Sequence, residues 1–154
     1  EPPPGAGGGR YRGMSGAAED PEEEWRRRCA QTKSSVDGLL QKQQPREALA
    51  EALRDPPYAP TQGEVKDSFR ALQDGAAHVV LKAIGAFKEA DDIRNATASL
   101  GEAEQLALLK YLYRFWGMGL PARTNAQLFA WHAALVEHAG ESAIASAIYD
   151  WKWP

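Results

Sequence analysis

The spacing of the apolar residues from residue 34 onward limits the possible folds of this chain more than any other feature. Apolar side chains recur three or four positions apart, and no stretch alternates strictly between polar and apolar residues. A period near 3.6 is typical of amphipathic helices, whereas a half-buried strand needs a period of two. One such stripe consists of Ala77, Val80, Leu81, Ile84 and Phe87. The pattern predicts an all-α fold.

Proline and glycine divide this pattern into short segments. Pro45 suits the first turn of a helix, while Pro56, Pro57 and Pro60 form a connector in which no helix can continue. Gly140 is expected to end a later apolar segment. We therefore predict a single compact bundle of about seven, at most eight, short helices.

Two capping boxes are expected to open helices, Thr61 with Glu64 and Thr124 with Gln127, because both side chains of this motif satisfy backbone N–H groups. The segment 102–116 is apolar on more than one side, which is typical of a central helix. The predicted helices contain Val36–Leu40, Ala48–Leu53, Val65–Leu72, Ala77–Phe87, Ile93–Ala96, Leu106–Trp116, Leu128–Val136 and Ile144–Trp151.

The first 21 residues differ sharply in composition from the rest. They hold six Gly and four Pro, so ten of 21 residues are of these two types. A segment with so few apolar side chains cannot offset the entropy lost on ordering. Met14 followed by Ser15 is typical of a translation start, so residues 1–13 are either native or an extension upstream of the natural start. We predict a flexible N-terminal arm over residues 1–33 and a helical domain over residues 34–154.

Residues 22–28 place three Glu and then three Arg around Trp25, so that each Glu precedes an Arg by four positions. Each such pair stabilises a helix by about 0.2–0.5 kcal/mol. One interpretation is a solvated, charge-paired helical turn. The other is a docking segment with Trp25 as its aromatic anchor, since Trp and Arg are common in interface hot spots.

Charge and cysteine content exclude several classes of protein. Lys and Arg number 18 and Asp and Glu 21, so the net charge of −3 does not favour a nucleic-acid binder or a polybasic membrane anchor. No run of about 18 apolar residues could span a membrane, and no secretory signal is recognisable. The single cysteine, Cys29, cannot form an internal disulfide. We expect a protein of the reducing cytosol.

The sequence lacks the motifs of metal and catalytic sites. Its three histidines have no metal-ligand spacing, and the segment after Gly140 lacks the second glycine of a nucleophile elbow. No glycine-rich phosphate-binding motif is present. Three neighbouring arginines are expected to lower the pKa of the Cys29 thiol, but no base is committed to it. We expect no enzyme, no cofactor and no metal ion.

Aromatic side chains concentrate at one place in the predicted bundle. Tyr111, Tyr113 and Trp116 gather at the end of one predicted helix, and Trp131 lies on the next. Most of them are expected to be core residues, with the remainder forming a partner surface. His132 shares the side of its helix with apolar residues, which favours a hydrogen-bonded structural histidine over a ligand.

The order of short motifs resembles a known family. The segments that carry the resemblance are Ser35–Leu40, Ala48–Pro57, Val65–Asp67, Val79–Lys82, Phe87–Lys88, Asp92–Ile93, Ser99–Leu100, Leu108–Tyr113, Trp131–His132 and Ala139–Gly140. Between Val36 and Ile148 the chain resembles subunit 5, the smallest (16-kDa) subunit, of the actin-related protein 2/3 complex. It departs from that family by ending in a Trp-rich segment instead of a short basic tail, and by an N-terminal segment with few acidic and aromatic residues.

The resemblance implies a non-catalytic, all-α subunit of the cytoplasmic assembly that nucleates branched actin filaments. It implies that the helical body packs on the β-propeller subunit and on subunit 4, that the N-terminal arm reaches an actin-related protein, and that actin filaments are contacted indirectly. The candidate interface residues are Trp25, Arg26, Arg27, Lys110, Tyr113, Trp116, Trp131 and His132. The alternative hypothesis is a free-standing helical adaptor that binds an amphipathic peptide in a groove.

Overall fold

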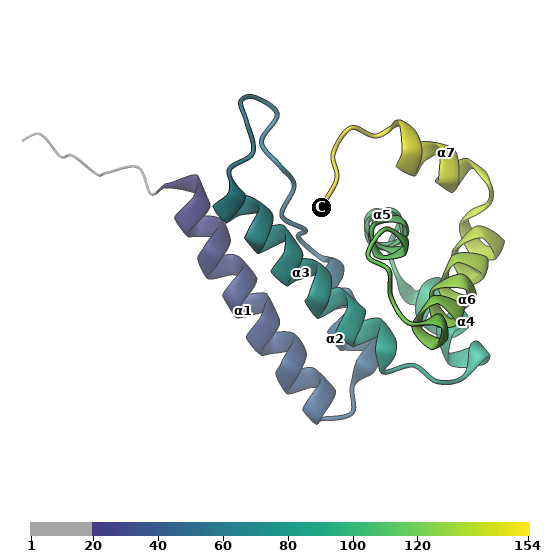
Figure 1. The fold of residues 1–154 in the computed structure, drawn as a ribbon. Helices are drawn as coiled ribbons and strands as arrows, with labels where there is room; N and C mark the ends of the chain where they lie inside the picture. Colours follow the sequence, from purple (N-terminus) through teal and green to yellow (C-terminus); the bar gives the residue numbers. More distant parts are fainter. Residues whose placement is uncertain (1–19) are drawn as a thin grey trace, which may run out of the picture.

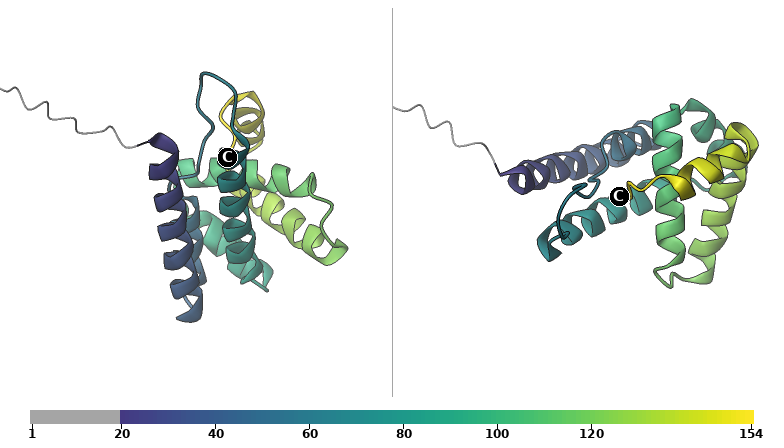
Figure 2. Two further views of the ribbon diagram at one scale, coloured as in Figure 1. Left: turned by 60° about the vertical axis from the view of Figure 1, so that its left-hand side comes forward. Right: turned by 90° about the horizontal axis from the view of Figure 1, so that it is seen from above.

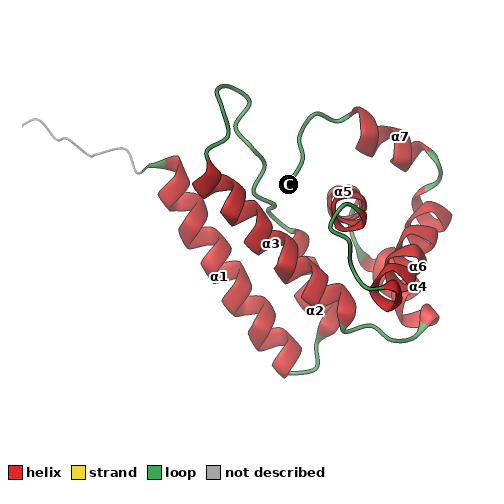
Figure 3. Ribbon diagram, in the orientation of Figure 1, coloured by secondary structure: helices red, strands yellow, loops and turns green. Residues whose placement is uncertain are grey.

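The structure is a computed structural model, and it describes residues 20–154. Within this range the chain forms helices and loops without strands (Figures 1 and 3). The all-α prediction and the predicted number of about seven helices are confirmed for the described residues. The helices are α1 (Pro21–Gln41), α2 (Pro45–Leu53), α3 (Asp67–Gly85), α4 (Ala90–Ser99), α5 (Glu102–Trp116), α6 (Ala122–Ala139) and α7 (Ser142–Tyr149).

The helices pack as two groups on one shared core. Helices α1, α2 and α3 contact one another and form the N-terminal group, while α6 and α7 pack with α4 and α5 in the C-terminal group (Figures 1 and 2). Helix α5 contacts α2 of the first group as well as α6 and α7. The prediction that residues 102–116 form a central helix is therefore confirmed.

The core consists of the apolar stripes that the sequence pattern indicated. The large apolar side chains that are less than 2% exposed come from α2, α3, α5 and α6, and each contributes about 1.5–3 kcal/mol of transfer free energy. They are Leu49, Leu53, Ile84, Leu108, Leu109, Tyr111, Leu112, Phe115, Leu128, Trp131 and Leu135. Phe87 packs edge-on against Trp131, with 5.1 Å between the ring centroids, and joins the end of α3 to α6.

The first helix begins earlier than predicted. Helix α1 starts at Pro21, so the prediction of a flexible arm up to residue 33 is wrong for residues 21–33. The Asp20 side chain accepts a hydrogen bond from the backbone N–H of Glu22 at 3.1 Å, and Pro21 occupies the first helical position. Three glutamates in the first turn also favour a helix start. The predictions for residues 1–19, including the question of residues 1–13, lie outside the described residues.

The first predicted capping box does not form. Residues 54–66 are a connector, and α3 begins at Asp67, well after Thr61 and Glu64. The two helices predicted on either side of residue 73 are one helix, because Phe69, Gln73 and Ala77 lie on one continuous buried face. Gly75 lies on the exposed side of α3 and does not interrupt it.

The second capping box is also wrong. Helix α6 begins at Ala122 after Pro121, so Thr124 already lies inside the first turn. The amide of Gln127 instead donates hydrogen bonds to the carbonyl oxygens of Ile84 and Phe87, at the end of α3. Gly140 ends α6 as predicted, whereas α7 ends at Tyr149 and leaves Trp151 outside the helix. No helix within residues 20–154 is long and apolar enough to cross a bilayer.

Candidate partner interface

Trp25 packs against its own chain as well as facing solvent. Its ring meets Phe69 of α3 edge-on, with 6.5 Å between centroids at 83°, and the guanidinium of Arg28 lies 4.8 Å from the indole centroid. This contact fixes the first half of α1 on the start of α3. The indole is half-buried, so part of it stays accessible beside a cavity of about 270 Å³ lined by Pro21, Val65 and other residues.

The charged residues around Trp25 form a paired helical surface. Arg26 forms ion pairs with Glu22 at 3.1 Å and with Glu23, and Arg28 lies 3.9 Å from Glu24. The i,i+4 pairs of Arg26 and Arg28 are therefore confirmed, as is the helical interpretation of this block. Arg26 and Arg27 are exposed on α1. Exposed pairs of this kind contribute at most about 1 kcal/mol each.

Lys110 and Trp131 do not belong to the surface. Trp131 is 0% exposed and Lys110 is 1% exposed, so neither side chain lies at the surface where the predicted partner contact would need it. Trp131 lies on the inner side of α6 against Phe87. The ammonium of Lys110 is held by the segment that follows α7, at 2.7 Å from the carboxylate of Asp150.

The other predicted aromatic residues form a cluster at the border of the core and the surface. The ring centroids of Tyr113 and Trp116 lie 5.7 Å apart, and His132 lies 5.8 and 5.4 Å from them. The hydroxyl of Tyr113 is 3.3 Å from Nε2 of His132, so the prediction of a hydrogen-bonded histidine is confirmed. Burial raises the pKa of Tyr113. Phe129 extends the cluster outward, because its ring lies 5.1 Å from Trp116 and is 62% exposed.

A groove continues this cluster along the junction of α6 and α7. Its volume is about 800 Å³, and its lining includes His132, Val136, Ile144, Ile148 and Tyr149. Ile148 and Tyr149 are 58% and 87% exposed, which is unusual for large apolar side chains. We call the surface formed by Phe129, His132, Val136, Ile144, Ile148 and Tyr149 the α6–α7 face.

Acidic side chains lie at the rim of this face. Glu137 and Glu141 line the groove, and Glu137 has one weak ion pair, 3.7 Å from Arg94 of α4. An apolar centre with a polar rim is the usual composition of a protein–protein interface. The acidic rim favours a partner surface that carries basic groups around apolar anchors.

The sequence prediction found only the edge of this face. It named Tyr113, Trp116 and His132 but missed Phe129, Ile148 and Tyr149. A usable signal was present, because α6 buries Leu128, Trp131 and Leu135 on one side and yet carries Phe129 and Val136 on another. Apolar residues in excess of what one buried stripe needs indicate a second contact surface.

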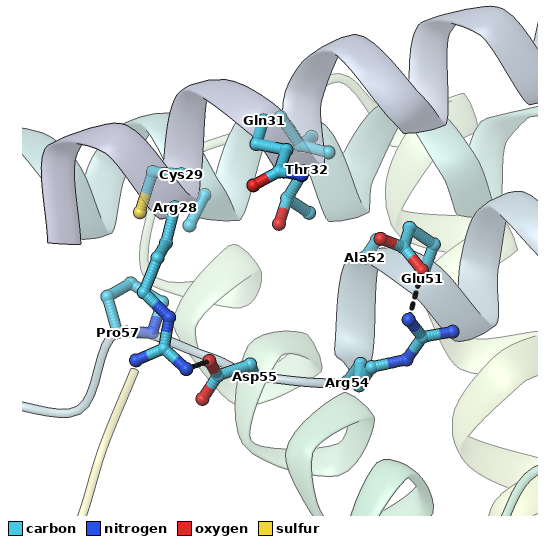
Figure 4. Close-up of a pocket in the computed structure, with 11 residues that line it drawn as sticks. Arg28, Cys29, Gln31, Thr32, Glu51, Ala52, Arg54, Asp55 and Pro57 are labelled. Atoms are coloured by element: carbon cyan, nitrogen blue, oxygen red, sulfur yellow. Dashed lines mark ion pairs between the residues drawn. The ribbon is translucent and has the colours of Figure 1, made fainter. Parts of the chain in front are cut away.

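A different cavity, of about 240 Å³, lies between α1 and the end of α2 and contains the one cysteine (Figure 4). In Figure 4 the side chain of Arg28 reaches down from α1 to the carboxylate of Asp55, and Arg54 pairs with Glu51 at 2.9 Å. Burial and the charge of Asp55 raise the pKa of the Cys29 thiol, although Arg28 opposes them. The expectation of a lowered thiol pKa is therefore wrong, and the ion pair of Arg28 with Asp55 joins α1 to the connector after α2.

The described residues contain no group of three or more His, Cys, Asp or Glu side chains placed to hold a metal ion. The surface around α6 and α7 has an apolar contact area and an acidic rim, and His132 in it is held by its hydrogen bond with Tyr113. Such a surface can bind another protein by shape and apolar burial.

Comparison with known proteins identifies similar chains. The family model described as ARP2/3 complex 16 kDa subunit (p16-Arc) matches residues 12–153. The actin-related protein 2/3 complex subunit 5 of Dictyostelium discoideum is 30% identical over 139 residues, which cover 90% of this chain and 92% of the relative. The actin-related protein 2/3 complex subunit 5-C of Xenopus laevis is 32% identical over 98 residues, covering 63% of this chain and 59% of the relative.

Proposed function

This chain belongs to the ARP2/3 complex 16 kDa subunit (p16-Arc) family, and on that premise we propose that it is a structural subunit that supports assembly of the complex and nucleation of branched actin filaments. In this proposal it performs no chemistry and acts by presenting a rigid helical body to its neighbours. It works in the cytoplasm with the actin cytoskeleton.

The α6–α7 face is the observation that supports this proposal most. Ile148 and Tyr149 line the groove and are more than half exposed, and Phe129, which is also more than half exposed, packs on Trp116 beside His132 of the groove. In an obligate complex, neighbouring subunits bury such side chains and remove them from water. We assign this face to the contact with the β-propeller subunit or subunit 4.

We assign a second contact, the one with an actin-related protein, to the opposite end of the molecule, where α1 begins. Residues that precede Asp20 join the body at the first turn of α1, beside Trp25 and the exposed Arg26 and Arg27. In the proposal these three side chains flank the path along which the N-terminal segment reaches an actin-related protein. The actin filament is then contacted through that protein and not by this chain directly.

The test is reconstitution with the other six subunits of the complex. We expect the wild-type chain to co-purify with them and to raise branched nucleation in a pyrene-actin assay above that of the complex lacking it. The variant Ile148→Asp places a charge on the α6–α7 face and is expected to lose co-purification. The matched control Ala103→Asp adds the same charge at an exposed position in the first turn of α5 and is expected to assemble normally.

Two results would contradict the proposal. A folded wild-type chain that stays outside the assembled complex would refute the subunit function. Normal assembly of Ile148→Asp would refute the assignment of the face but not the function. If the free chain instead bound short amphipathic peptides in the α6–α7 groove, the adaptor hypothesis would replace the subunit hypothesis, and Ile148→Asp would abolish that binding.

A further inference from the structure

The segment after α7, residues 150–154, returns across the molecule in an extended conformation. It leaves α7 in the C-terminal group and ends beside α3 and α5 (Figures 1 and 2). Pro154 is buried and Trp153 is half-buried against the body, whereas Trp151 is 62% exposed. We call residues 150–154 the return segment.

Backbone oxygen atoms of three successive residues of the return segment accept hydrogen bonds from three side chains of the body. Lys110 donates to the oxygen of Lys152, and Gln73 donates to that of Trp153 at 3.2 Å. Arg114 donates to the oxygen of Pro154 at 2.8 Å. Hydrogen bonds to the main chain are one of the ways in which proteins bind an extended peptide.

Lys110 gives this contact its strength. Its side chain is 1% exposed, and its Nζ lies 2.7 Å from the Asp150 carboxylate, which is 31% exposed. The rings of Tyr58 and Trp153 lie 5.3 and 5.9 Å from Nζ. A buried ammonium without a partner is strongly unfavourable, so the body of the protein needs the return segment in place. Hydrogen bonds from Lys110 also lower the pKa of Asp150, which keeps the carboxylate ionised.

The donors come from both helical groups. Lys110 and Arg114 lie on α5, whereas Gln73 lies on α3, where its amide also holds the carbonyl oxygen of Pro57 at 2.9 Å. Arg114 forms a further ion pair with Asp74 of α3. The return segment therefore lies in the seam between α3 and α5 and is bonded to both.

We propose that Gln73, Lys110 and Arg114 form a peptide-binding site whose ligand is the chain's own return segment, and that this bound segment fixes the N-terminal helical group against the C-terminal group. The site binds an extended segment with a carboxylate at its start and an aromatic residue three positions later. Direct contact of α2 with α5 and the Gln127 bonds join the two groups elsewhere, so loss of the segment loosens the seam without separating the groups.

The proposal is tested on the purified full chain by measuring the distance between the two groups. Spin labels are attached at Ser34→Cys on α1 and Ala126→Cys on α6, both exposed positions, in a Cys29→Ala background. The binding site is disrupted by Lys110→Met, which keeps the apolar stem, and in a second variant by deleting residues 150–154. The matched control is Lys82→Met, which removes another lysine 2.7 Å from an aspartate, but inside the N-terminal group.

We expect one narrow distance distribution for the parent and for Lys82→Met, and a broadened one for both disrupted variants. Amide exchange in α3 and α5 is expected to rise by about tenfold in the same two variants while α1 is unchanged. A narrow, parent-like distribution after deletion of residues 150–154 would overturn the proposal. The proposal would also be overturned if Lys110→Met unfolded while the deletion variant kept the parent distances. Lys110 would then stabilise the core without acting through the return segment.

Discussion

At the scale of single residues, two tyrosines on α5 differ in whether their hydroxyl groups have a hydrogen-bond partner. Among the described residues, no group hydrogen-bonds the hydroxyl of the fully buried Tyr111, whereas that of Tyr113 meets His132. Burial also raises the pKa of Tyr111, because the phenolate form would lose its solvation. The two side chains therefore contribute differently to stability despite lying two positions apart.

We predict opposite effects of removing these hydroxyl groups. Tyr111→Phe deletes a buried polar group without a partner and should raise the free energy of unfolding by up to about 1 kcal/mol. Tyr113→Phe breaks a hydrogen bond and should lower it by about 0.5–1.5 kcal/mol. Urea denaturation of both variants measures the difference, and a clear loss of stability in Tyr111→Phe would contradict the description of its site.

The Asp37 carboxyl group makes the free energy of unfolding depend on pH. It accepts hydrogen bonds from Lys33 at 2.8 Å and Lys82 at 2.7 Å, which lower its pKa from 3.8 to about 2. A carboxyl whose pKa is lower in the folded state stabilises that state above the unfolded pKa of about 3.9 and ceases to do so as pH falls through the folded value.

We therefore expect the Tm of Asp37→Asn to be lower than that of the wild type at pH 6. The difference in Tm should disappear between pH 4 and about pH 2. Calorimetry across this range measures it. The variant Asp67→Asn is the control, since its carboxylate is almost fully exposed and 3.3 Å from Arg70. A Tm gap for Asp37→Asn that stays constant down to pH 2 would show that the two lysines do not perturb this carboxyl.

The sequence predicted which residues lie on helices better than it predicted what surrounds each side chain. Periodicity placed Trp131 and Tyr113 on helices, but it could not tell which side of α6 faces the core, because both sides carry apolar residues. Lys110 was named as a candidate interface residue, although it is buried. Its burial depends on Asp150, 40 positions away, and no local pattern encodes such a contact.

At the scale of elements, proline and glycine were reliable signals and capping boxes were not. Pro45 begins α2 and Gly140 ends α6, since each restricts or permits backbone angles by its own structure. The Thr61 and Thr124 motifs failed because tertiary contacts decided those boundaries. Gln127 uses its amide to hold the end of α3 in place, and the buried face of α3 starts at Phe69.

Two glycines, one after the end of a helix and one inside a helix, should respond oppositely to substitution by alanine. Gly140 has φ 82° and ψ 168°, a conformation that almost only glycine adopts. Gly140→Ala should therefore lower the free energy of unfolding by about 1–3 kcal/mol. Gly38 lies inside α1, where an added Cβ meets no atom within 4 Å, and Gly38→Ala should stabilise by about 0.5–1 kcal/mol. Thermal denaturation of both variants checks this, and equal effects would refute it.

At the scale of the whole molecule, the order of motifs predicted more than any single pattern. The resemblance seen between Val36 and Ile148 is confirmed by the family match over residues 12–153. The path of the return segment was beyond such prediction. Its path depends on donors that α3 and α5 bring together only after folding.

The exposed α6–α7 face should make the isolated chain associate with itself. Apolar side chains such as Ile148 and Tyr149 gain free energy when any apolar surface covers them. We expect the sedimentation coefficient of the free wild-type chain to rise with concentration and that of Ile148→Asp to stay constant. Ala103→Asp should behave like the wild type, and a wild-type chain that remains monomeric at high concentration would argue against a surface that needs a partner.

Hydroxyl-radical footprinting of the chain, alone and within the assembled complex, measures whether other subunits cover the α6–α7 face. We expect oxidation of Phe129, Ile148 and Tyr149 to fall strongly on assembly, while oxidation of the exposed His78 on α3 serves as the internal reference. Equal oxidation of Phe129, Ile148 and Tyr149 in the free and the assembled chain would contradict this expectation.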